Sequence, residues 1–155
     1  MTSMRALTIA FLTAALACFG ARPLSAQVTM RGGNPSISIT TGAAGGQPVS
    51  VISTSSSIRW AKKTVISKIT VSTSCPGQRF SLKVLAINLS SGVAAPAVTL
   101  TNGMLASDFL TSIPANDASS RTCTLQYTAS ATFAQGNSTE LGNDVHTVTY
   151  TMLAQ

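Results

Sequence analysis

The stretch TVISKITVSTSCPGQRFSLKVLAIN, residues 64–88, decides the fold class, because apolar and polar side chains alternate on both sides of a Pro-Gly turn. Ile69 and Val71 share one face of its first half, in the period-2 pattern of a half-buried β-strand. Pro76 and Gly77 occupy the central positions of a type II turn, where Pro fixes φ and Gly accepts a positive φ. The stretch therefore predicts a β-hairpin.

Similar alternation continues toward the C-terminus. A short strand is predicted at 97–101, and residues 104–113 read as either a strand or a helical turn. The segment 122–133 alternates cleanly and, with the chain's last strand, predicts a second hairpin over 122–152. Thr, Ser, Val and Ile dominate the mature chain, whereas Glu and Lys are scarce, and the β-branched Thr, Val and Ile favour strands. The sequence thus predicts an all-β protein, an antiparallel, immunoglobulin-like β-sandwich of about seven or eight strands.

The N-terminal third differs from the rest. Two short strands are predicted, at Ser36–Thr41 and Val49–Ser53, on either side of a linker of glycine and other small residues. We therefore divide the mature chain into a flexible extension, 27–60, and a sandwich domain, 61–155, and leave open whether strands from 36–60 join the sandwich.

Residues 1–26 are predicted to be a cleaved secretory signal peptide, because one cation precedes an uncharged apolar run that ends in small residues. That run is shorter than the roughly 20 residues of a membrane span, so we expect no stable membrane span after cleavage behind Ala26. A lipoprotein processing site, with Cys18 as the lipidated residue, is the alternative. Localisation is then secreted, periplasmic or at the cell surface, and the compact signal indicates a bacterial source.

Two cysteines remain after cleavage, Cys75 and Cys123, in a chain destined for an oxidising compartment. An even count in that setting predicts a disulfide between them. Their separation of 48 positions corresponds to a stabilisation of about 4 kcal/mol in the loop-entropy model.

Charge and titratable residues argue against several functions. Without the basic residues of the signal, eight cations face four acids, and this scattered charge of +4 lacks the dense basic stripe that nucleic acids require. His146 is the single histidine, and Asp144 lies two positions before it, so the two share a face of a strand and, with a serine, suggest a hydrolase triad. No serine lies in a nucleophile elbow, and no metal-ligand or phosphate-loop spacing occurs. We therefore predict no enzyme activity, no cofactor and no metal.

An aromatic residue beside three cations raises one candidate recognition patch for an anionic polymer or a membrane surface. Its members are Arg59, Trp60, Lys62 and Lys63. The alternative is a core tryptophan at a strand end, because Trp is usually buried.

The Ser/Thr-rich exported chain, with a Gly-rich N-terminal extension and a C-terminal strand ending VTYTM, resembles subunits of bacterial surface fibres of the chaperone-usher fimbrial type. The resemblance implies a structural or adhesive role and protein partners, through self-association by strand addition. Residues 27–41, with Ile37 and Ile39 two apart, are then the candidate donor strand. The competing class is a secreted or periplasmic module that binds a carbohydrate or a protein.

Overall fold

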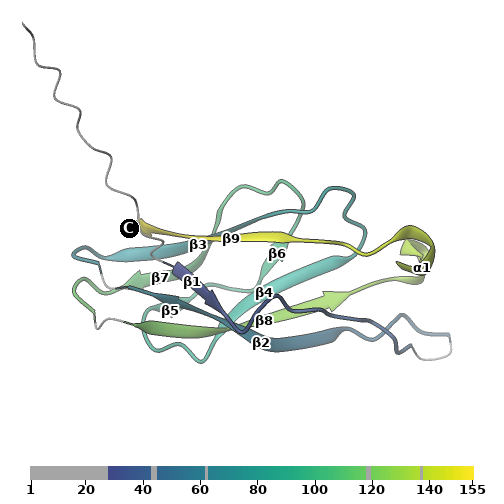
Figure 1. Ribbon diagram of the computed structural model, residues 1–155, viewed down its shortest axis with the longest axis horizontal. Helices are drawn as coiled ribbons and strands as arrows, with labels where there is room; N and C mark the ends of the chain where they lie inside the picture. Colours follow the sequence, from purple (N-terminus) through teal and green to yellow (C-terminus); the bar gives the residue numbers. More distant parts are fainter. Residues whose placement is uncertain (1–27, 43–44, 62, 118–119, 137) are drawn as a thin grey trace, which may run out of the picture.

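The computed structural model describes residues 28–42, 45–61, 63–117, 120–136 and 138–155, so the predicted signal peptide and Cys18 lie outside the described residues. Two antiparallel β-sheets pack face to face (Figure 1). The five-stranded sheet has the order β1 (Val28–Arg31), β2 (Val51–Trp60), β8 (Arg121–Ser130), β4 (Ser81–Ile87), β6 (Val98–Leu100). The four-stranded sheet has the order β5 (Val93–Ala94), β7 (Ser107–Ile113), β3 (Ser67–Ser74), β9 (Thr147–Ala154). The predicted all-β sandwich is confirmed.

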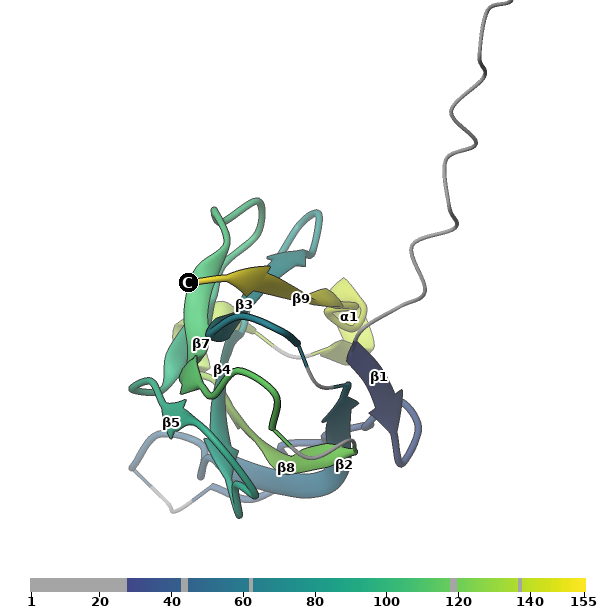
Figure 2. The same ribbon diagram turned by 90° about the vertical axis from the view of Figure 1, so that its left-hand side faces the viewer.

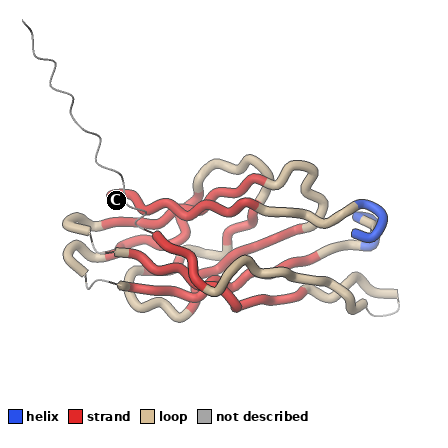
Figure 3. The backbone as a smooth tube through the Cα atoms, viewed as in Figure 1, coloured by secondary structure: helices blue, strands red, loops and turns tan. Residues whose placement is uncertain are grey.

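A short connection of helical turns joins β8 to β9 and marks one end of the sandwich (Figure 3). It contains the 3-10 turn η1 (Phe133–Gln135) and the single turn α1 (Ser138–Leu141). We call this the α1 end; β3 and β8 end there, and β4 and β9 begin there. At the opposite end, the far end, β8 begins, and β2, β4 and β9 end. In the ranges described, no helix has the length and apolarity that crossing a bilayer requires.

The core lies between the sheets because each strand turns its apolar face inward. Ile69 of β3, Val84 of β4 and Phe109 of β7 are fully or almost fully buried. The Phe109 and Tyr150 ring centroids lie 5.1 Å apart, within the range that aromatic pairs favour, and the ring planes are tilted by 57°. The Tyr150 hydroxyl lies 3.0 Å from the Tyr127 hydroxyl of the other sheet, so a hydrogen bond also links the sheets through the core.

The hairpin predicted at 64–88 is wrong, although its turn is confirmed. Gly77 has φ of 76°, and the Gln78 N–H donates to the Cys75 carbonyl at 3.0 Å. However, β3 pairs with β7 and β9, whereas β4 pairs with β8 and β6. The two strands cover the same core from opposite sheets. Alternation predicts which face is buried, but it does not distinguish pairing within a sheet from packing across the core.

The second predicted hairpin, over 122–152, is wrong for the same reason. β8 belongs to the five-stranded sheet and β9 to the four-stranded sheet. The segment 104–113 resolves to strand β7, one of the two alternatives that the sequence left open.

Part of the predicted N-terminal extension belongs to the sandwich. The predicted strand at 49–53 is the start of β2, which lies next to β8 and ends in the buried Trp60. The predicted strand at 36–41 is not formed, and an isolated bridge between Gly42 and Pro48 is the nearest strand-like pairing.

Candidate functional site

Three side chains with potential catalytic or metal-binding chemistry meet at the α1 end. Cys75 directly follows β3, and Asp144 and His146 lie in the loop that leads into β9. One potential ligand atom from each residue lies within 4.8 Å of the other two. Ser74 pairs with Thr147 in the β3–β9 ladder, which places the residues after β3 beside those before β9. Cys75 is fully buried, whereas the other two are half-buried.

Backbone amides hold the Asp144 carboxylate in place. Its Oδ2 accepts hydrogen bonds from the N–H groups of Arg79, at 2.9 Å, and Phe80, at 2.8 Å. Within the part of the chain that the structure describes, Oδ1 forms no hydrogen bond. Among the described residues, no Lys or Arg forms an ion pair with this carboxylate. The carboxylate therefore uses one oxygen for these backbone amides and has a second oxygen available for a ligand.

A hydroxyl group on β3 orients the His146 ring. The Thr73 hydroxyl donates to the Thr147 carbonyl at 3.3 Å and lies 3.3 Å from His146 Nδ1. Because its only proton is used in the first contact, the hydroxyl accepts from Nδ1–H in the second. This arrangement leaves the lone pair on Nε2, and the other nitrogen of a ligating histidine usually makes such a bond.

The protonation of the cluster does not suit a thiol nucleophile. Burial raises the pKa of the Cys75 thiol, the charge of Asp144 raises it further, and a hydrogen bond from the Val145 backbone acts in the opposite direction. Burial lowers the pKa of His146, against the opposing effect of Asp144. The pair is therefore a thiol with a neutral imidazole, and a reactive cysteine needs a thiolate that substrate can reach. What the three groups offer is a set of sulfur, nitrogen and oxygen ligands.

Sequence reasoning noted that Asp144 and His146 share a face but predicted no metal site. It missed Cys75 as their neighbour because the hairpin prediction paired β3 with β4 instead of β9. The available signal was the position of Cys75 directly after a strand. It becomes informative only once the partner strand is known.

The predicted disulfide between Cys75 and Cys123 is not formed, and both are free, buried thiols. Cys123 is near the start of β8, seven positions before Ser130, which pairs with Ser81 at the α1 end. Seven residues of strand span roughly 24 Å, whereas a disulfide needs Cα atoms within about 7 Å. The two cysteines therefore lie toward opposite ends of the sandwich, and not at the same end as expected. Burial raises the pKa of Cys123 to about 12.

The predicted recognition patch is not formed as a surface. Trp60 is 1% exposed and packs in the core, so its ring cannot stack on a ligand. Arg59 donates to the Ser120 hydroxyl, and the Lys63 carbonyl accepts from the Asn116 N–H at 2.6 Å. Lys62 lies outside the described residues. The alternative interpretation, a core tryptophan at the end of a strand, is correct.

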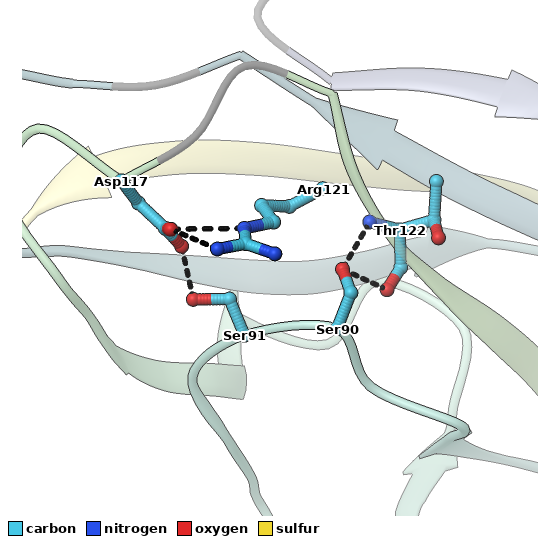
Figure 4. Close-up of polar contacts among 5 residues, drawn as sticks. All are labelled: Ser90, Ser91, Asp117, Arg121 and Thr122. Atoms are coloured by element: carbon cyan, nitrogen blue, oxygen red, sulfur yellow. Dashed lines mark hydrogen bonds and ion pairs between the residues drawn. The ribbon is translucent and has the colours of Figure 1, made fainter.

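Polar side chains tie the loops of the far end to β8 (Figure 4). Asp117 Oδ1 accepts from Arg121 Nε at 2.9 Å and from Nη2 at 2.6 Å, and its other oxygen accepts from the Ser91 hydroxyl. The Ser90 hydroxyl accepts from the Thr122 N–H at 2.7 Å and donates to the Thr122 carbonyl at 2.9 Å. The polar groups of these side chains therefore bond to other parts of the protein, an arrangement that indicates a structural role.

An open hollow of about 470 Å³ lies beside the Cys75–Gln78 turn. Gln78, in its lining, donates to the Phe80 and Leu100 carbonyls and accepts from the Asn102 N–H at 2.7 Å. Asn102 in turn accepts from the Cys75 N–H at 2.8 Å. The side-chain amides of Gln78 and Asn102 are therefore bonded to backbone groups beside the hollow.

The candidate donor segment packs against the sandwich of its own chain. Its residues 28–31 pair with β2 as β1, and the segment continues without strand pairing to Thr41. Val28 and Ile37 pack against the core, and Ile39 is half-buried. Figure 2 shows β1 between β2 of one sheet and β9 of the other, on the open side of the sandwich.

Gly32 brings the segment close to β2. It has φ of +88°, and a Cβ at this position would lie 2.2 Å from the Ser55 carbonyl oxygen, beside the irregular pairing between Ser53 and Ser56. Gly33 also has a positive φ, +76°, but a Cβ there would meet open space. Of these two glycines, only Gly32 lies too close to β2 to accept a side chain.

Comparison with known proteins gives no relative from which a function can be transferred: no family model, curated protein or solved structure matches this chain.

Proposed function

We propose that the protein is an exported, non-catalytic subunit of the bacterial cell surface, which assembles by exchanging residues 28–41 between copies. The predicted signal peptide supports the compartment, and the resemblance to surface-fibre subunits supports the structural role. The all-β sandwich agrees with both.

One observation carries the proposal: residues 28–41 cover the open side of their own sandwich through few regular contacts. β1 makes four residue pairs with β2, and beyond it Ile37 packs against the core without strand pairing. A segment held in this way can leave one body and cover the same side of an identical one, because both sites are the same. After exchange, the segment makes the same contacts on the second copy as it made on its own, so no additional interface is needed.

The connection that follows the segment gives it enough reach. Residues 42–48 read GAAGGQP, and seven extended residues span roughly 23–25 Å. A connection of this length allows the segment to reach a neighbouring copy that is in direct contact with its own body.

A non-catalytic role is supported by the Cys75 thiol, which is fully buried and has a raised pKa. The competing role, a carbohydrate- or protein-binding module, receives less support. In the hollow beside the Cys75–Gln78 turn, the Gln78 side chain is bonded to backbone groups, and Trp60, a member of the candidate recognition patch, is buried.

A disulfide that locks the segment in place tests the proposal. Arg31 and Ser57 are direct cross-strand partners in β1 and β2, so Arg31→Cys with Ser57→Cys joins the segment to its own body. We expect the protein, purified after export, to form higher oligomers with rising concentration in multi-angle light scattering. The oxidised double variant is expected to stay monomeric, and reduction is expected to restore association.

The reduced double variant is the matched control, because it carries the same substitutions without the covalent bond. Mass spectrometry of the oxidised variant confirms that the new bond lies within one chain and leaves Cys75 and Cys123 unpaired. Equal association of the oxidised and reduced forms, or a wild-type protein that stays monomeric at all concentrations, would show that segment exchange is wrong.

A further inference from the structure

We propose that Cys75, Asp144 and His146 form a binding site for a divalent transition-metal ion, with Zn²⁺ as the expected occupant. Their potential ligand atoms already lie within 4.8 Å of one another. In a tetrahedral zinc site, with bonds of about 2.0–2.3 Å, neighbouring ligand atoms are roughly 3.5 Å apart. The ligand atoms must therefore move closer together by about 1 Å to bind the ion. Rotation of the half-buried Asp144 and His146 side chains can supply this movement.

The ligand types select the metal. A sulfur, an imidazole nitrogen and a carboxylate oxygen are the donors that Zn²⁺ takes in proteins, whereas Mg²⁺ and Ca²⁺ prefer sites made only of oxygen. A thiolate and the Asp144 carboxylate together carry the two negative charges that a dication neutralises. Three protein ligands leave one tetrahedral position for water, and the half-buried Asp144 and His146 leave a solvent path to it.

Groups next to the three ligands already contact them through hydrogen bonds, as the outer shell of a metal site does. The Thr73 hydroxyl contacts His146 Nδ1 at 3.3 Å, which leaves Nε2 free for the metal. The Arg79 and Phe80 amides fix one oxygen of Asp144 at 2.9 and 2.8 Å. A hydrogen bond from the Val145 backbone reaches the Cys75 sulfur. Such partners orient metal ligands and raise affinity.

The site has a mechanical consequence for the fold. Cys75 ends β3, whereas Asp144 and His146 begin the approach to β9, so an ion ties the two strands together at the α1 end. Because the unfolded chain has no such preformed site, binding stabilises the folded state. None of the three ligands belongs to residues 28–41, so the site can be tested separately from any exchange of that segment.

Cobalt titration tests the site, because Co²⁺ replaces Zn²⁺ and its thiolate complexes absorb in the near ultraviolet. The exported wild-type protein is first freed of metal with a chelator and then titrated with Co²⁺. We expect a thiolate-to-cobalt charge-transfer band that saturates at one ion per chain and disappears when Zn²⁺ is added. We also expect Zn²⁺ to raise the unfolding temperature and the chelator to reverse that rise.

Variants distinguish the cluster from adventitious binding. Cys75→Ser is expected to abolish the charge-transfer band. His146→Gln is expected to weaken Co²⁺ binding by more than the roughly 10–100-fold loss that an outer-shell change causes. Cys123→Ser, which alters the other buried thiol near the far end, is the matched control and is expected to leave the titration unchanged. Circular dichroism checks that each variant is folded.

Several results would overturn the site. One is a folded wild-type protein that shows no charge-transfer band in excess Co²⁺. Another is a band that survives Cys75→Ser and is lost in Cys123→Ser. Binding that persists with unchanged affinity in His146→Gln would assign the ion to other surface groups.

Discussion

Phe109→Ala is expected to destabilise the protein by about 3–5 kcal/mol, the range for deleting a buried aromatic ring. Phe109 is 1% exposed and lies on β7, where its ring contacts Tyr150 of β9. The deletion removes both the burial and an aromatic contact between two strands of the four-stranded sheet. Chemical denaturation followed by circular dichroism measures the change in the free energy of unfolding.

Phe133→Ala is the matched control, because the same side chain is removed from a site where it is 62% exposed. Its expected cost is under about 1 kcal/mol. If the two substitutions cost the same, the packing of the two sheets around Phe109 would be wrong.

Changing the two cysteines is expected to have independent effects. Cys123→Ser places a hydroxyl in a core position that is 1% exposed, at an expected cost of about 1–3 kcal/mol. Cys75→Ser is expected to cost less, because the Val145 backbone lies beside this position as a hydrogen-bond partner. With the sites far apart, the double variant is expected to cost the sum of the two within about 0.5 kcal/mol.

The unfolding experiment is performed in chelator without reductant, so that neither a metal nor a reducing agent alters the result. A thiol reagent added to the unfolded protein is expected to detect both Cys75 and Cys123. If the single variants cost the same, the double variant costs no more, and no free thiol is found, then the cysteines are paired and their placement toward opposite ends is wrong.

The sequence allowed the strands to be located but not paired. Alternation identified β3, β4 and β8 because side chains on successive positions face opposite sides of a strand. The turn at Pro76 and Gly77 was identified because the two residues have distinct φ requirements. The partner of a strand depends on contacts far along the chain, and both hairpin predictions assigned neighbouring strands to one sheet. The disulfide prediction was wrong for this reason, since it required Cys75 and Cys123 at the same end.

The candidate site was predictable only in part. The spacing of Asp144 and His146 was visible, because positions two apart share a face of a strand. Cys75 joins them through the β3–β9 ladder, 69 positions before Asp144, which no local pattern encodes. At Trp60, in contrast, the local pattern was misleading. The three cations near it suggested a surface patch, whereas its side chain, at the end of β2, is buried in the core.

Mixing two single-cysteine variants is the most direct test of segment exchange. One copy carries Arg31→Cys and the other Ser57→Cys, so the cross-strand pair can form only when the segment of one copy lies on β2 of another. Replacing the Ser57→Cys partner by one that carries Lys83→Cys, at an exposed position on β4, gives the rate of random crosslinking. We predict covalent mixed dimers of the Arg31 and Ser57 variants well above that rate. Crosslinking no greater than in the Lys83 control would contradict the account.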